Sequence, residues 1–485
     1  MSPMVLAGNG NAISKFETRI PKSEGNPKFN ERKLDQYKRV IISYFEFRIS
    51  IFGRISYFAF RICSAICLAV LALTASQRSV AQGKDFEIRA ADVLNVRRFG
   101  TQQIQALIGR VHMIQPSPSG DVKIWCDSAF RNMKTNVVDL YGHVKIIRDS
   151  VTLTSTEGTY SGNDRKAVMP NDIMLIRGGM MLTSKYGEYW ANDKKSFFRG
   201  DVHVVDSASS TWSDVLTYYE AEEKSVAVGN VKVTSPENNL TVFGDSLVHF
   251  DKDKHTMVPK NPRLMQIDTS SSGGLDTLLI VSTRMEAFQD SLQRFIAIGR
   301  VEMARADFAA RCGEATYYYR KDRIVLRQMP VVWSAENQVS GDSIVITTKD
   351  RKLQSVYVRG RAMAVSRADS LSKARFNQLS AREVTLRFTG GKITQINADR
   401  TATSLYYLAD GSTPNGVNRS SGDQIIMDFS FGKIDRIKIV GGVEGRYFPE
   451  KMIAKHENEY NLEGFRWIAD RPRRKLLTIV HDSND

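Results

Sequence analysis

Five aspartates recur at similar places along the chain and are the first candidates for chemistry. They are Asp127, Asp214, Asp245, Asp342 and Asp423. Two carboxylates held close together could act as a general acid and a general base in hydrolysis. These residues are instead spread along the chain, about one to a repeat, and several precede Ser, which is typical of turns. We therefore predict that they are corner residues of a repeat and not catalytic groups.

The histidines and cysteines are also too widely spaced to form a site. His112 and His203 occupy the same position in two separate repeats, whereas metal ligands must converge within about 2 Å of one ion. Cys126 and Cys312 lie several repeats apart, and a disulfide needs Cα atoms within about 7 Å of each other. We expect two unpaired, mostly buried thiols. Because motifs for nucleophiles, zinc proteases and phosphate loops are also missing, we expect no catalytic residue, metal or cofactor.

A nine-residue phrase is repeated between these residues, for example SVAVGNVKV from 225 and FIAIGRVEM from 295. Each copy places Gly, Val and another apolar residue two positions apart, with polar residues between them. This alternation predicts a strand with one dry and one wet face, because a helix would space its apolar residues three and four apart. The residues predicted to face inward, as tentative lipid-binding positions, are Val111, Met113, Gly142, Val144, Ile146, Gly200, Val202, Val204, Gly229, Val231, Val233, Gly299, Val301 and Met303.

The phrases and the acidic residues recur with a period of about 30 residues and two strands per period, which indicates stacked repeats. Some repeats replace the glycine by proline, at Pro170, Pro259, Pro262 and Pro330. Both residue types mark bulges or strand ends, so we place them where the chain bends from one sheet to the next. The sequence predicts an all-β fold, a repetitive β-jellyroll or open β-solenoid of stacked two-sheet rungs.

The first 81 residues differ from the rest and are predicted to be an export signal with a long n-region. Their apolar run at 62–75 is short for a membrane span, follows basic residues and precedes a small-x-small cleavage site at Ser79-Val80-Ala81. The alternative is an uncleaved inner-membrane anchor at 41–75. The remaining chain divides into repeats at 82–267, a second stack at 276–447 and a basic C-terminal tail at 448–485. The Ser- and Gly-rich stretch at 268–277 either separates the two stacks or forms a long corner loop.

The net charge is only moderately basic. The whole chain has 68 Lys and Arg against 53 Asp and Glu, a formal charge of +15. Without the export signal, 56 basic and 48 acidic residues remain, or about +8. This excess suits an anionic partner or membrane surface, or simply a solvated mixed surface. Nothing in the pattern indicates a nucleic-acid partner.

The order of these phrases resembles the OstA-like family, which includes the periplasmic bridge component of lipopolysaccharide transport and the soluble N-terminal domain of the outer-membrane lipopolysaccharide translocon. The resemblance is carried by IGRVHM, YGHVKI, RGDVHV, VGNVKV and IGRVEM, and by SGDQIIMDFSFGKIDRIKIVGGVEG at 421–445. It implies a β-jellyroll open along one seam, an apolar interior that shields acyl chains, and end-to-end stacking. This chain is longer than a typical bridge protomer and lacks the translocon's barrel.

The resemblance also implies where the protein works and with what. We expect a periplasmic protein of a Gram-negative bacterium, associated with the outer membrane, whose partners are lipopolysaccharide or its lipid A part, transport components at both membranes, and further copies of itself. The alternative from the residues alone is an exported β-solenoid that binds polysaccharide or acts as a structural scaffold.

The glycines on the predicted inward face need a separate explanation, because glycine weakens a strand by roughly 0.5–1 kcal/mol relative to alanine. Two explanations are open. A neighbouring aromatic residue such as Tyr218 or Phe295 could fill the space beside the glycine, or the space could be left for a lipid chain.

Overall fold

A computed structural model describes residues 16–17 and 87–474, apart from short gaps of which 116–120, 270–274 and 369–373 are the longest. Except for β1 (Phe16–Glu17), the predicted export signal lies outside the described residues. The chain divides into two compact units, Phe52–Ile298 and Gly299–Asp485, the latter with Met1–Ile51. We call them the first and the second unit and describe each separately. Apart from one short α-helix and two 3-10 helices, the regular elements of the described residues are strands.

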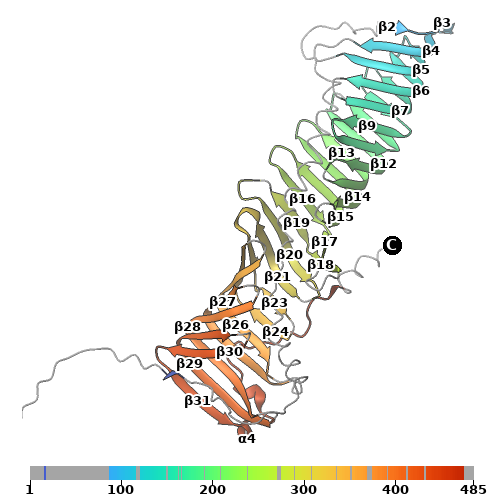
Figure 1. Ribbon diagram of the computed structural model, residues 1–485. Coiled ribbons are helices and arrows are strands. Elements are labelled where there is room, and N and C mark those ends of the chain that lie inside the picture. Colours follow the sequence, from blue (N-terminus) through green and yellow to red (C-terminus); the bar gives the residue numbers. More distant parts are fainter. Residues whose placement is uncertain are drawn as a thin grey trace, which may run out of the picture. The chain divides into compact units, whose positions relative to one another are not determined.

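The first unit is a stack of antiparallel strands (Figure 1). Its strands are β2 (Glu87–Ala90), β3 (Val93–Phe99), β4 (Gln102–Gln115), β5 (Val122–Asn132), β6 (Val137–Arg148), β7 (Val151–Ser161), β8 (Lys166–Met169), β9 (Ile173–Arg177), β10 (Met180–Ser184), β11 (Tyr186–Trp190), β12 (Lys195–Val205), β13 (Ser210–Tyr219), β14 (Lys224–Ser235), β15 (Leu240–Phe250), β16 (His255–Lys260), β17 (Arg263–Thr269), β18 (Leu275–Val281), β19 (Arg284–Phe288) and β20 (Arg294–Ala304), which crosses the division. Most long strands pair with their neighbours in the chain, whereas shorter strands also pair with strands two or three positions away, as β8 does with β11 and β16 with β19.

The long strands β4, β6, β12 and β14 of the first unit each have a bulge near the middle, where the register with the paired strands shifts and the chain forms a corner. In β12 the register shifts between Arg199 and Val202, so that the strand carries one more residue there than β13 opposite. The extra residue belongs to a bulge at Gly200 and Asp201, whose φ angles are 79° and 48°. A bulge bends a strand and breaks its ladder locally. The residues before and after the corner therefore form two arms, and the stacked arms form two facing sheets.

The prolines lie at the same corner, as the sequence predicted. Pro170 lies between β8 and β9, Pro262 between β16 and β17, and Pro330 between β22 and β23. Pro259 is the second-last residue of β16. Proline has no amide hydrogen for the ladder, so in these repeats the bend becomes a break between two short strands. The predicted fold class, an all-β stack of two-sheet rungs, is confirmed.

The Ser- and Gly-rich stretch lies between two paired strands. Its flanking residues pair directly, Ile267 with Thr277 and Asp268 with Asp276, and so connect β17 and β18 as a hairpin. The division between the compact units lies later, between Ile298 and Gly299.

The second unit continues the same pattern with longer strands and ends in a short helical segment. Its elements are β21 (Ala309–Tyr318), η2 (Tyr319–Lys321), β22 (Arg323–Arg327), β23 (Val331–Ser334), β24 (Asn337–Ser340), β25 (Ser343–Lys349), β26 (Lys352–Arg367), β27 (Phe376–Thr389), β28 (Lys392–Asp410), β29 (Thr413–Ser430), β30 (Lys433–Val440), β31 (Glu444–Pro449), α4 (Glu450–Ile453) and η3 (Glu457–Tyr460).

Residues 450–470, which we call the C-terminal strap, pack on the outer face of the second unit. In β14 the inward residues Val231 and Val233 follow the corner glycine by two and four positions; the equivalents in β26 are Ala362 and Ala364. Met363 and Val365 therefore face the opposite side, and they are buried with Ile453 of the strap. The strap was predicted only as a tail, and its packing is a finding of the structure.

Candidate functional site

The interior between the two arms of the first unit is lined by columns of apolar side chains. In antiparallel pairs, residues directly opposite each other point to the same face, so the strand register traces each column. On one arm, here arm 1, the column is Leu107, Ala129, Leu140, Met169, Phe198, Leu216, Ala227, Leu247, Met285 and Ala297. On the other, arm 2, it is Met113, Ile124, Ile146, Leu153, Leu175, Leu182, Val204, Thr211, Val233, Val242, Leu264 and Ile280.

The predicted inward residues of the repeated phrase that belong to the first unit line this interior beside the corner. Every predicted valine and methionine of the set is buried: Val111, Met113, Val144, Val202, Val204, Val231, Val233, Val301 and Met303. Ile146 is partly buried and packs against a core cluster. The glycines Gly142, Gly200, Gly229 and Gly299 are half-buried at the corners. The repeated phrase did not predict most of the inward residues of arm 1, because the residues of that column vary between small, aromatic and aliphatic types.

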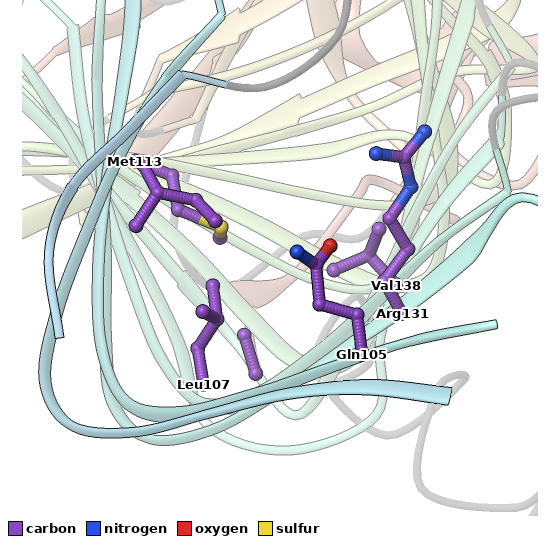
Figure 2. A pocket seen from close by; sticks show the side chains of 7 residues that line it. Gln105, Leu107, Met113, Arg131 and Val138 are labelled. Carbon is purple, nitrogen blue, oxygen red and sulfur yellow. The ribbon is translucent and has the colours of Figure 1, made fainter. Parts of the chain in front are cut away.

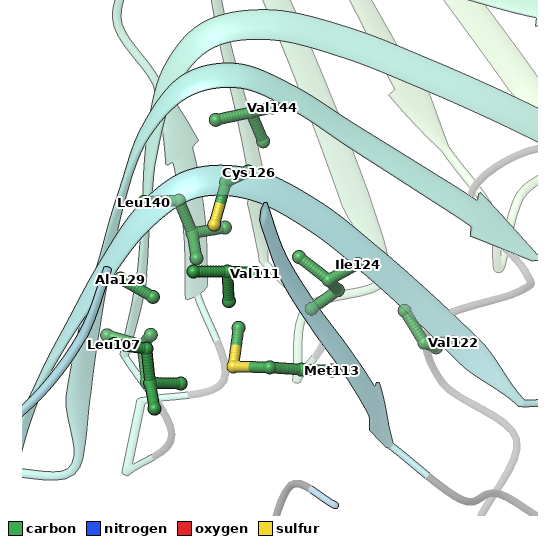
Figure 3. Packing of buried hydrophobic residues seen from close by; sticks show 10 residues of the cluster. Leu107, Val111, Met113, Val122, Ile124, Cys126, Ala129, Leu140 and Val144 are labelled. Carbon is green, nitrogen blue, oxygen red and sulfur yellow. The ribbon is translucent and has the colours of Figure 1, made fainter. Parts of the chain in front are cut away.

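At the N-terminal end of the first unit, the two arms pack directly on each other. Leu107, Ala129 and Leu140 come from arm 1, and Val111 and Ile124 come from arm 2; all are in one cluster of buried residues. Figure 3 shows these side chains gathered inside the bend, with the strands arching round them. Val111 is 1% exposed. The arms therefore cover each other's apolar faces in this structure.

The same end of the interior opens to solvent. A pocket with about 290 Å³ of empty volume, part of it open solvent, is lined by Leu107 and Met113 on one side and by Gln105, Arg131 and Val138 on the other (Figure 2). The edge strands β2 and β3 each pair with β4. Apolar side chains there are exposed, among them Leu94 at 55% and Val93 at 50%. Within the part of the chain that the structure describes, this end thus combines a sheet edge that no further strand covers with the mouth of the interior.

The recurring aspartates hold the corners. The carboxylate of Asp214 accepts a hydrogen bond from Asn230 Nδ2 at 3.0 Å, and that of Asp342 accepts from Arg361 Nε at 2.9 Å. Asp127 Oδ2 lies 2.8 Å from His143 Nδ1 in the same arrangement. In each case the partner is the residue after the corner glycine of the next strand, in a left-handed conformation. The prediction that these aspartates are corner residues is confirmed.

At Gly142 and Gly229, the space beside the glycine is neither filled by an aromatic ring nor left as a gap for a lipid chain, so both explanations offered for these glycines are wrong. A Cβ atom at Gly229 would overlap Oδ2 of Asp214, and one at Gly142 would overlap Oδ2 of Asp127. Their φ angles are 79° and 72°, a region that side chains disfavour. The missing side chain is therefore replaced by a carboxylate of the next strand, and neither an aromatic ring nor space for a lipid is needed there.

One corner has the opposite polarity. Beside Gly200 the acidic partner is replaced by Lys185, whose Nζ lies 2.5 Å from Asp201 Oδ2. The Asp201 carboxylate raises the pKa of Lys185 through this hydrogen bond. The corner thus requires a polar pair across two strands, but not a particular sign of charge on either strand.

The two cysteines outside the predicted export signal, Cys126 and Cys312, are unpaired and buried, as predicted. Burial raises the pKa of the Cys126 thiol to about 11 and that of Cys312 to about 12, so both are protonated and unreactive near neutral pH. His112 stacks on Trp125 with ring centroids 4.7 Å apart, and His203 stacks on Trp212 at 4.5 Å. Among the described residues, no group of three or more His, Cys, Asp or Glu side chains could hold a metal ion.

The fold and the interior define a class of protein: a stack of bent antiparallel strands enclosing an apolar interior, with its polar residues engaged in corners. Comparison with known families agrees. Residues 84–242 match the family described as OstA-like protein, and residues 191–352 match the family described as LptA/(LptD N-terminal domain) LPS transport protein. No curated protein matches the chain.

The two matches overlap and together run from 84 to 352, more than half of the 485 residues. The chain belongs to the OstA-like family and has a role in lipopolysaccharide transport. Both matched families are described as OstA-like or transport proteins, and neither description names an enzyme. Among the described residues, no helix is long and apolar enough to span a membrane.

Proposed function

We propose that the protein carries lipopolysaccharide toward the outer membrane by enclosing its acyl chains between the two arms. The observation that supports this most directly is the column of arm 2, which extends from Met113 to Ile280 and is apolar at every position except Thr211. Each methylene moved from water into such an interior gains about 0.8 kcal/mol. A lipid with several chains could therefore leave a membrane without a large net loss.

Lipid entry requires the arms to part. Val144, Val202 and Val301 are each at most 1% exposed, because the two arms cover one another. The corner pairs are polar and lie outside the apolar columns, so they can hold the strands together while the arm ends separate. The proposed binding positions remain those that line the interior beside the corner, from Val111 to Met303.

The protein acts in the periplasm, next to the outer membrane, together with other lipopolysaccharide-transport components and further copies of itself. The match to LptA- and LptD-type domains supports this placement. Self-association is supported by the exposed edge strands β2 and β3, which could extend the sheet of another copy through backbone pairing. Residues 1–81 would direct export, and 82–267 and 276–447 would be the two sets of repeats, followed by the segment 448–485.

Depletion in the native host tests this function. If expression is shut off, newly made lipopolysaccharide should accumulate in the inner membrane, and its rate of arrival at the cell surface should fall severalfold before growth stops. Phospholipid and outer-membrane protein levels, measured in the same cells, serve as controls. Unchanged arrival of lipopolysaccharide at the surface would contradict the proposal and favour a structural scaffold.

A further inference from the structure

Three buried hydroxyl groups face the apolar interior of the first unit without a hydrogen-bond partner among the described residues. They belong to Ser196, Ser225 and Thr211, which are 1%, 1% and 5% exposed. Ser196 and Ser225 are on arm 1, and Thr211 is on arm 2 between Val204 and Val233. A buried polar group without a partner costs roughly 1–3 kcal/mol, so such groups need a reason.

Ser196 and Ser225 belong to a column of their own. Ser196 pairs with Tyr218, and Tyr218 pairs with Ser225. The column continues from Ser225 to His249 and then to Thr256. These positions lie two residues farther from the corner than the apolar column with Phe198 and Ala227. They are close to the hairpin ends of arm 1, and so near the outer margin of the interior.

Small size alone does not explain the two serines. A small residue beside Tyr218 makes room for its ring, but alanine would serve equally well. Ala287 does occupy this column two positions beyond His249. Replacing a serine by alanine would remove an unpaired hydroxyl without changing the packing much. The hydroxyl groups themselves therefore call for a function.

Thr256, in the same column, is a buried residue whose hydroxyl does have a hydrogen-bond partner. Thr256 Oγ1 lies 2.7 Å from His249 Nδ1, and His249 Nε2 lies 3.1 Å from Asp251 Oδ1. Both ring nitrogens of His249 are thus engaged, and none is left for Ser225. The contrast between the bonded Thr256 and the unbonded serines occurs within one column of one sheet.

We propose that Ser196 and Ser225 form a polar subsite for an oxygen atom carried on an acyl chain, namely a chain hydroxyl or the carbonyl of an ester or amide. This inference depends on the proposed function. The apolar column nearer the corner would take the methylenes, and the two hydroxyls near the margin would bond the isolated oxygen close to the head group. The ligand class is therefore an acylated lipid with oxygen-substituted chains, in preference to a plain alkyl chain.

Two probes of equal length test the subsite with the purified exported protein: 3-hydroxytetradecanoate and tetradecanoate, compared by displacement of a fluorescent fatty acid. The wild-type protein should bind the hydroxylated chain about fivefold more tightly, the equivalent of one hydrogen bond. The double variant Ser196→Ala/Ser225→Ala should bind both probes equally, with the affinity for tetradecanoate unchanged. Its melting temperature should equal or exceed that of the wild type.

Thr256→Val is the matched control, because it removes a buried hydroxyl that does have a partner. It should lower the melting temperature and leave the preference between the probes intact. Equal binding of both probes by the wild type, or a preference kept by the double variant, would contradict the proposed subsite. Neither result would contradict lipid binding in the interior between the two arms. A lower melting temperature of the double variant would show that the serines are structural. If neither the probes nor lipopolysaccharide bind to the wild type, the enclosure of acyl chains between the arms, and with it the proposed function, is contradicted.

Discussion

Asp214 and Gly229 show how one pair of residues builds a corner at the residue scale. The glycine adopts a left-handed conformation, Asn230 after it does the same, and the Asp214 carboxylate fills the place of the absent side chain. Similar pairs recur at Asp127 with Gly142 and at Asp342 with Gly360. The corner is thus specified by two residues on neighbouring strands and not by the glycine alone.

Gly229→Ala should destabilise the protein more than Gly178→Ala does. Gly178 has a φ of 54° and open space around it, so alanine there meets only the cost of the left-handed conformation, roughly 1–2 kcal/mol. At Gly229 the methyl group must also displace Asp214, and overpacking adds about 1–3 kcal/mol. Denaturant unfolding of the two variants checks this. Equal losses would show that the Asp214 contact is unimportant.

The strand and the bend at this corner could be predicted from the sequence, but the reason for the glycine could not. The alternation around Gly229 and Val231 indicated a strand with an inward face, and glycine and proline indicated the bend. The reason for the glycine was missed, although Asp214 and Gly229 lie fifteen residues apart, as do Asp127 and Gly142. That spacing places the two on adjacent strands of a hairpin, but only the backbone conformation shows that the carboxylate fills the space.

At the scale of elements, the C-terminal strap is held by two buried glutamines that form hydrogen bonds with its main chain and with the side chain of Asn461. Gln378 Oε1 accepts a hydrogen bond from the Leu462 amide at 2.9 Å, and its Nε2 donates to Asn461 Oδ1 at 2.5 Å. Gln338 Oε1 accepts from the Ile468 amide at 2.9 Å, and its Nε2 donates to the Arg466 carbonyl at 2.7 Å.

Ion pairs and aromatic rings fasten the strap further. The Arg375 guanidinium lies 2.5 Å from Glu450 and 3.3 Å from Glu457. Trp467 and Phe376 have ring centroids 5.0 Å apart. The strap thus covers the apolar outer face of the second unit at Met363, Val365 and Phe376. The sequence could not predict this, because the strap has no periodic pattern and its partners are far away in the chain.

Gln378→Met should lower the stability of the second unit by about 1–3 kcal/mol, because it keeps the volume but leaves the buried Leu462 amide without its acceptor. Gln354→Met, at an exposed position of β26, is the matched control and should change stability by less than about 0.5 kcal/mol. Hydrogen exchange of residues 460–468 is the measurement. Faster exchange there in the control, or no change in Gln378→Met, would contradict the role of the glutamine.

At the scale of the whole molecule, the chain is a family member whose two units share one construction: bent strands, polar corners and an apolar interior. The family matches support a role in lipopolysaccharide transport, whereas the enclosure of acyl chains between the arms is our proposal. Because the buried valines cover one another, the account requires that the arms open when lipid enters.

Photo-crosslinking in living cells tests this central claim most directly. A photoreactive amino acid is placed in turn at Val144, Val202 and Val231, which face the interior, and at Lys145 and Lys232, which are exposed neighbours on the same strands. After irradiation, lipopolysaccharide adducts of the protein are detected by immunoblotting. The account predicts adducts at the inward positions and severalfold fewer at the outward ones. The enclosure of acyl chains between the arms would be contradicted if the folded, exported protein gave no adduct at any inward position. Equal amounts of adduct on both faces would also contradict it.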